Sequence, residues 1–260
     1  MKKNLYYKTM FRRHNRIKEF FFNLFLAICS VPRLLLEVFV RKNFGERYFS
    51  FSTAMITAFI LFWIPFFSMS VTTSFFRVQG WIESKVLIFI LFYLSWYVAL
   101  AAFVYMCIKR RNEIKRLPSV FDFARFSLSA GTIHPEFYKI SIRGKHFNIR
   151  QIETMIEPAF FYLIGLTLFL MGQFVGNLIM FCAVCYSISY FATYWQGDNF
   201  IMDKIDEMIL NEEYVNAFVD GMDPDDTRGV RYYGRAPVDP EVRRQLVDSI
   251  IVDTDFVEAK

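Results

Sequence analysis

The chain has 260 residues, of which 55% are hydrophobic and 19% aromatic, and its formal net charge is +5. Both fractions exceed those of an ordinary soluble domain. The excess is concentrated in blocks, because 50–76, 86–108 and 158–197 contain no charged residue. Since about 20 apolar residues suffice for a helix to cross a bilayer, this pattern excludes an ordinary soluble protein and predicts an all-α integral membrane protein.

The block 158–197 is too long for one crossing and must reverse direction within the membrane region. The segment 172–177 contains two glycines and an asparagine, which favour a tight turn between helices. The expected crossings are then 158–171 and 178–195. Because the first is short, a re-entrant hairpin is the alternative. The sequence thus predicts four crossings in two hairpins, 50–108 and 158–197.

The N-terminal region 1–49 is predicted to contain a basic N-terminus and an interfacial amphipathic helix kinked at Pro32. In 12–41, polar residues recur at three- and four-residue steps and form one stripe. Arg33 and Glu37 would each cost roughly 2.5–3.5 kcal/mol near the centre of a crossing, so the interface is favoured. A fifth crossing is the alternative. The segment is expected to be uncleaved, because Ile28 before Cys29 is not small.

Basic residues indicate the orientation of the chain. Residues 1–18 contain seven bases and no acid, and a second basic cluster begins at Lys109. The positive-inside rule therefore places the N-terminus, 109–157 and the C-terminus in the cytoplasm, in an inner membrane. Bases expected to contact anionic headgroups at the cytoplasmic face are Lys2, Lys3, Arg12, Arg13, Arg16, Lys18, Arg33 and Arg41.

The basic cytoplasmic segment 109–157 is expected to contain a small β element, because 125–133 and 138–147 alternate polar and apolar residues around glycines. Asn148 and Gln151 then resemble a capping box, which predicts a helix that continues toward the membrane.

The tail 198–260 is acidic, with 16 acids and seven bases, and is predicted to be helical. One helix is expected to begin at Asp198 and end near Gly221, and a second to run from Asp239 to about Val252. The tail could stay off the membrane surface or pack on the basic loop. Because the first helix is amphipathic, the protein's own loop or another protein must cover it. Residues expected to dock a partner are Ile201, Ile205, Met208, Ile209, Val215, Phe218, Arg228, Arg231, Tyr232, Tyr233 and Arg235.

Residue clusters that could carry chemistry are better explained without it. Cys182 and Cys185 lie inside an expected crossing without further ligands, which favours a packing role. His134 and His146, with Glu136 and Glu153 nearby, match no metal motif. The aspartates of 223–226 lack the pattern of a calcium loop and favour a turn. No catalytic, cofactor-binding or metal site is expected, and the acidic surroundings of 228–235 disfavour nucleic-acid binding.

The predicted function is that of a noncatalytic subunit that anchors and docks components of a larger membrane assembly. The general layout is similar to that of small multi-pass proteins encoded beside conjugation and secretion machinery in bacterial mobile elements, although no motif carries this likeness. A transporter or channel is the first alternative, disfavoured because the four expected crossings contain no charge. A membrane-embedded enzyme is the second alternative.

Overall fold

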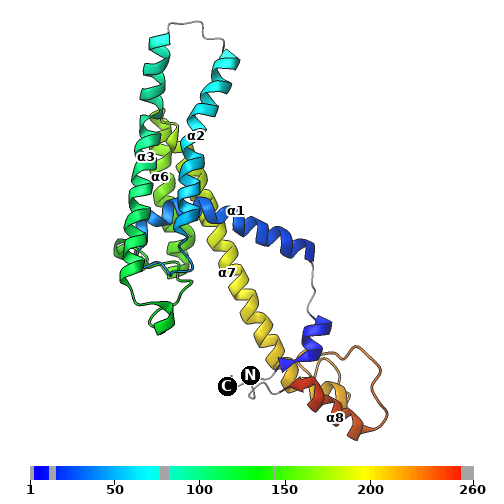
Figure 1. Ribbon diagram of the computed structural model, residues 1–260. Coiled ribbons are helices and arrows are strands. Elements are labelled where there is room, and N and C mark those ends of the chain that lie inside the picture. Colours follow the sequence, from blue (N-terminus) through cyan, green and yellow to red (C-terminus); the bar gives the residue numbers. More distant parts are fainter. Residues whose placement is uncertain (1–2, 12–15, 77–81, 143, 253–260) are drawn as a thin grey trace. The chain divides into compact units, whose positions relative to one another are not determined.

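The computed structural model describes residues 3–11, 16–76, 82–142 and 144–252 (Figure 1). The chain forms two compact units. The helical unit comprises Phe21–Thr193, and the terminal unit comprises Met1–Phe20 with Tyr194–Lys260. The boundaries between the units fall within the two helices α1 (Arg16–Val40) and α7 (Val175–Tyr214).

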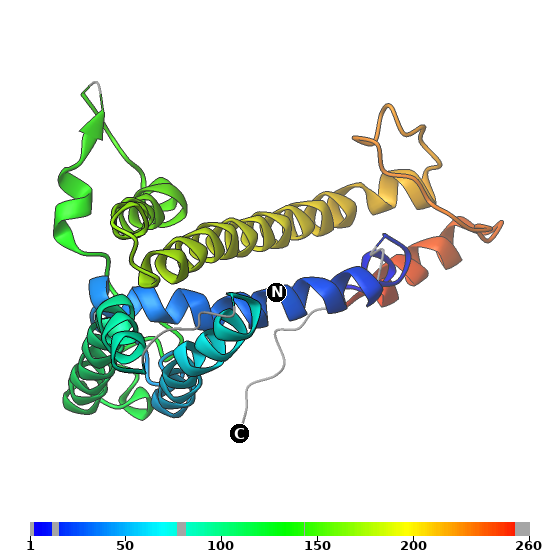
Figure 2. The same cartoon turned by 90° about the horizontal axis from the view of Figure 1, so that it is seen from above.

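The helical unit is built around α2 (Phe51–Phe76), α3 (Ile82–Arg116), α6 (Glu157–Leu170) and parts of α1 and α7. Helices α2 and α3 run side by side, whereas the part of α1 in this unit crosses them steeply (Figures 1 and 2). A buried cluster joins Val38 of α1 to Ala54 of α2 and Phe103 of α3. The C-terminal end of α1 is therefore part of the core.

Three helices of the described part are long and apolar enough to cross a membrane, namely Ile17–Val40, Ile149–Leu170 and Val175–Phe218. This supports the expected membrane protein. The apolar part of α2 counted in the same way, Phe51–Phe67, is shorter. The first of the three helices corresponds to the segment expected at the interface. Four crossings in two hairpins therefore remain a prediction.

The turn between α6 and α7 lies where the glycines predicted it. Helix α6 ends at Leu170, Gly172 has a φ of +74°, and α7 begins at Val175. In the other direction, α6 continues without a break from α5 (Ile149–Gln151) through the π-helical turn Ile152–Ile156. The predicted capping box of Asn148 and Gln151 is confirmed at its start. The helix thus begins nine residues before the expected crossing.

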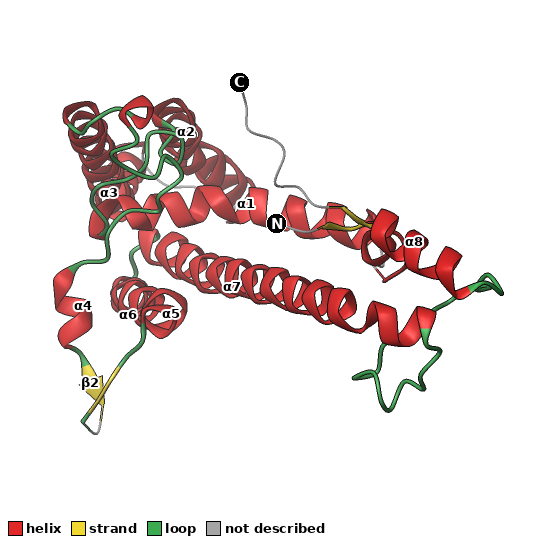
Figure 3. Cartoon of the chain, turned by 90° about the horizontal axis from the view of Figure 1, so that it is seen from below, coloured by secondary structure: helices red, strands yellow, loops and turns green. Residues whose placement is uncertain are grey.

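Two loop regions, 41–50 and 117–148, pair with each other at one end of the helical unit (Figure 3). Gly45 N donates to Ser129 O at 2.9 Å, and Lys42 and Thr132 form an isolated β-bridge. The short elements of the second loop are Val120–Asp122, α4 (Pro135–Lys139), β2 (Ser141–Ile142) and β3 (Lys145–His146). Strands β2 and β3 pair through two residues each, which is too short to establish the expected β-containing loop.

In the terminal unit, α7 extends to Tyr214 and is followed by the π-helical turn Val215–Val219, with Gly221 at a φ of +67°. The expected helix start at Asp198 is wrong, because α7 continues through Gly197. A Cβ at Gly197 would have no other atom within 4 Å. The other elements are β1 (Lys3–Asn4), Tyr7–Phe11, α8 (Pro240–Ile250) and β4 (Ile251–Val252), which pairs antiparallel with β1.

The N-terminal segment packs on the C-terminal part of α7. Asn4 N donates to Glu207 Oε1 at 3.0 Å, and Asn4 Nδ2 donates to Asn211 Oδ1 at 2.7 Å. Tyr7 donates to Asp203, and burial together with the nearby acids raises the pKa of Tyr7 to about 12. The phenol therefore stays a donor at neutral pH. The acidic tail is thus paired with the N-terminal segment in the terminal unit.

We expect Gly176→Ala to separate α6 from α7, because a Cβ at this position would lie 2.5 Å from Phe169 N and 2.6 Å from Gly165 O. The expected loss is about 1–3 kcal/mol of unfolding free energy, measured by SDS titration in mixed micelles. Gly197→Ala is the matched control on the same helix. Nothing lies within 4 Å of its Cβ, so this variant should be neutral or slightly more stable. Equal effects of the two substitutions would contradict the close helix contact.

Candidate functional site

The most distinctive site of the helical unit is a buried network of charges and phenols around Arg41. Arg41 follows α1 directly, and its side chain is fully buried. Its Nε and Nη2 donate to Glu157 Oε2, and Nη1 lies 3.0 Å from Glu153 Oε1. Tyr186 also donates to Glu157 Oε2. One arginine thereby joins the end of α1 to the start of α6 and, through the shared carboxylate, to α7.

The network continues along α1 through Glu37 and Arg33. Glu37 is buried and accepts hydrogen bonds from Tyr190 at 2.6 Å and from Tyr48 at 2.8 Å. Arg33 Nε lies 3.3 Å from Glu37 Oε1, and its Nη atoms donate to Ser189 and Tyr48. Burial, followed by the Glu37 carboxylate, raises the pKa of the Tyr48 phenol above its ordinary value. Tyr48 therefore stays protonated and donates to Glu37.

Helical spacing explains why these side chains meet. Residues four apart lie on the same face of a helix, one turn above the other. Arg33, Glu37 and Arg41 have this spacing at the end of α1, and Tyr186 and Tyr190 have it on α7. Glu153 of the π-helical turn and Glu157 at the start of α6 are also four residues apart. Three helical faces therefore each contribute a row of groups with complementary charge or hydrogen-bonding capacity.

Burial and pairing give this network a structural role. Removing one partner of a buried ion pair leaves the other charge unpaired and costs about 3–5 kcal/mol. Both Arg41 and Glu157 are inaccessible to solvent. The other carboxylate oxygen of Glu157 is buried without a hydrogen-bond partner among the described residues.

This site differs from the sequence-based expectation. Arg33 and Arg41 were expected to contact headgroups, and the structure corrects this because both pair with glutamates inside the protein. Glu153, considered with the histidines for a metal, pairs with Arg41 instead. The available signal was the spacing of the charged residues 33, 37 and 41 in one segment and of the acids 153 and 157 in another.

The other basic residues expected to contact lipid headgroups lie near the N-terminus. Lys18 lies over the ring of Trp195 at 5.2 Å in the terminal unit. Lys3 contributes its backbone to β1. Arg16 begins α1. Lys2, Arg12 and Arg13 lie outside the described residues.

The residues expected to dock a partner divide into core and surface. Phe218 is buried in the core of the terminal unit, and Tyr232 packs against it with ring centroids 4.4 Å apart. Arg228 pairs with Glu212 and Glu213. Ile209 is half-buried, whereas Arg231, Tyr233 and Arg235 are exposed. The α7 row is defined as the exposed residues Ile201, Ile205 and Met208 of α7 together with Val215 of the π-helical turn that follows it. This row remains available for contact.

The other clusters weighed in the sequence do not assemble into sites. Cys182 is buried and Cys185 half-buried on α7, both as free thiols. His134 caps α4 by accepting from Glu136 N at 3.4 Å. Within the described part of the chain, no group of three or more histidine, cysteine or acidic side chains could hold a metal ion.

Comparisons of the chain with known protein families, with curated proteins and with solved structures find no match.

We expect Arg41→Gln to lower the unfolding free energy by about 3–5 kcal/mol, because it leaves Glu157 charged and buried without its cation. SDS titration in mixed micelles measures the change. The double variant Arg41→Gln with Glu157→Gln should regain much of the loss, since both charges are then removed.

The control for this prediction is Lys139→Gln, which breaks the exposed pair with Glu136 and should cost less than about 1 kcal/mol. A stability of Arg41→Gln that equals that of Lys139→Gln would contradict the structural role of the network.

Proposed function

We propose that the chain is a noncatalytic membrane subunit that anchors a larger assembly and docks another protein through its terminal unit. The observation that carries this proposal is the α7 row, which lies beyond the uncharged stretch 158–197 on a folded unit. The core of that unit forms elsewhere, around Leu210, Tyr214 and Val247. A row of exposed apolar side chains outside the membrane is typical of a protein-binding surface.

The terminal unit also supports an even number of crossings. It contains the N-terminal segment and the C-terminal tail, which pair through β1 and β4. The two ends of the chain must then lie on the same side of the membrane. Crossings by α2, α3, α6 and α7 satisfy this requirement, whereas an additional crossing by α1 does not. This parity favours four crossings with α1 at the interface, although α1 is long enough to cross.

The exposure of α1 supports the same arrangement. Its exposed apolar residues recur at three- and four-residue steps and share one face; they are Ile17, Phe20, Phe21, Leu24 and Ile28. Polar residues such as Glu19 and Asn23 lie on the opposite face. Such a helix can bury its apolar face in the membrane while it lies along the surface. By the positive-inside rule this surface is the cytoplasmic face of an inner membrane.

A transporter or channel is the second candidate, because buried glutamates lie in helices that are long enough to cross a membrane. Two of these helices each contain a buried glutamate, Glu37 in one and Glu157 in the other. One carboxylate oxygen of Glu157 is buried without a hydrogen-bond partner among the described residues. Flux of protons and common ions into liposomes tests this candidate, and no flux above that of protein-free liposomes would exclude it for those ions. Conjugation or secretion machinery remains the proposed setting of the docking role.

We expect the double substitution Ile205→Asp with Met208→Asp to abolish co-purification of the partner in mild detergent, because it places two charges in the centre of the α7 row. Quantitative mass spectrometry of material purified through a tag on this chain measures the partner per subunit. Loss of the partner with normal membrane insertion is the expected result.

The matched control is Val242→Asp with Leu246→Asp, which introduces two charges at exposed apolar residues of α8 in the same unit. This variant should retain the partner. If the α7 row variant also retained it, or if the unaltered chain purified without any stoichiometric partner, the docking proposal would fail.

A further inference from the structure

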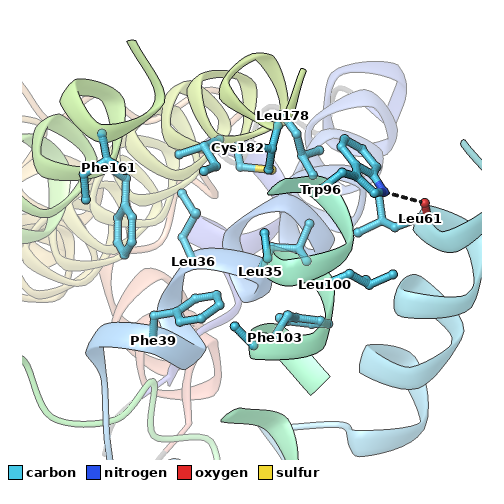
Figure 4. A pocket seen from close by; sticks show the side chains of 15 residues that line it. Leu35, Leu36, Phe39, Leu61, Trp96, Leu100, Phe103, Phe161, Leu178 and Cys182 are labelled. Carbon is cyan, nitrogen blue, oxygen red and sulfur yellow. Dashed lines mark hydrogen bonds between the residues drawn. The ribbon is translucent and has the colours of Figure 1, made fainter. Parts of the chain in front are cut away.

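The helical unit contains an apolar cavity of about 250 Å³ between α3, α6 and α7, with α1 at one end (Figure 4). Trp96 of α3 and Leu178 of α7 lie at one end of the cavity (Figure 4). Phe39 of α1, Phe103 of α3 and Phe161 of α6 line the other end. A space of this size between membrane helices needs either an occupant or a reason not to collapse.

Fixed contacts on both sides keep the cavity open. Helix α6 is held against α7 by the close approach of Gly165 and Gly176, and it is held to the end of α1 by Glu157 and Arg41. Helix α3 is held to α1 on its other side, where Arg110 Nε donates to Val38 O at 3.0 Å. Between these contacts α3 presents the small residue Ala99 to the cavity, so no side chain fills the gap.

The lining restricts the occupant to a hydrocarbon. Nearly every lining side chain is aliphatic or aromatic. The indole N–H of Trp96 donates to Leu61 O at 3.0 Å and so offers no free hydrogen bond (Figure 4). Cys182 contributes a buried thiol, which is a weak hydrogen-bonding group. Water is disfavoured in such a cavity because it needs several polar partners.

The cavity has an accessible side. Three of its lining residues are exposed, namely Phe39, Ala102 and Ile164. In a membrane this side faces lipid chains, which are the abundant hydrocarbon there. Lys109 lies seven residues after Ala102 on the same face of α3 and is exposed, about 10 Å farther toward the basic end of this helix. Its charge is complementary to an anionic headgroup.

We propose that this cavity binds one acyl chain of an anionic phospholipid, whose headgroup lies beside Lys109. The inference depends on the membrane location of the helical unit and not on the docking role of the terminal unit. Its test is therefore independent of partner binding.

Tryptophan quenching by brominated lipid tests the proposal, because bromine quenches only on close approach. The variant retains Trp96 and replaces Trp63, Trp81 and Trp195 with phenylalanine. Trp96 is only 3% exposed, so lipids around the protein do not reach it unless a chain enters the cavity. In nanodiscs that contain phosphatidylglycerol with brominated chains, we expect strong quenching of Trp96. An unquenched Trp96 in the folded protein would overturn the proposal.

Two matched substitutions locate the effect. Ala99→Leu fills the cavity and should remove most of the quenching, whereas Ala101→Leu, at an exposed position outside the lining, should leave it unchanged. Equal quenching in the two variants would contradict the cavity as the binding site. If Ala99→Leu does not fold, Ala102→Leu provides a second filling variant at the accessible side.

The headgroup is tested by placing bromine on a minor lipid component that is either anionic or zwitterionic. In the protein with Lys109 unaltered, the anionic lipid should quench Trp96 more strongly than the zwitterionic lipid. The Lys109→Gln variant should show no such difference. Equal quenching by both lipids before the substitution would overturn the assignment of an anionic headgroup.

Discussion

The arrangement of the helical unit depends on the ion pair between Arg41 and Glu157. This pair connects the end of α1 to the start of α6 across 116 positions of sequence. Tyr186 and Tyr190 add α7 to the same group, and Glu37 and Arg33 extend it along α1. Because none of these charges can be left unpaired in a hydrophobic interior, the network fixes the position of α1 against the other helices.

The position of α1 has consequences in both units. At its C-terminal end, α1 contacts the core and closes one end of the apolar cavity. Along its earlier turns, its apolar face is exposed at Phe21, Leu24 and Ile28. The pairing of the two ends of the chain in the terminal unit favours an α1 that lies along the membrane.

Local signals in the sequence predicted several elements correctly because they depend on nearby residues. Asn148 and Gln151 cap a helix, Asp239 caps α8 by accepting from Glu241 N, and Gly172 adopts the positive φ of the turn. Each of these features involves residues only a few positions apart, and their geometry follows from standard capping and turn chemistry.

Features that depend on distant partners could not be predicted in the same way. The sequence shows the polar stripe that contains Arg33 and Arg41. It does not show whether these arginines contact lipid headgroups or glutamates inside the protein, because that depends on where α6 packs. Helix α7 was expected to break before Asp198, yet one exposed glycine costs a long helix only about 1 kcal/mol and does not end it. The cavity depends on the spacing of α3 and α6, which no local pattern encodes.

We propose that α1 lies along the cytoplasmic face and does not cross the membrane. Labelling of single cysteines in sealed vesicles of known orientation tests this placement, with a membrane-impermeant maleimide and the four native cysteines replaced. The reporters replace Met10 before α1, Glu46 after α1, the exposed Met171 beside the α6–α7 turn and Met222 in the tail. We expect positions 10, 46 and 222 to be labelled from the cytoplasmic side and position 171 from the opposite side. Labelling of positions 10 and 46 from opposite sides would show that α1 crosses the membrane and would contradict the account.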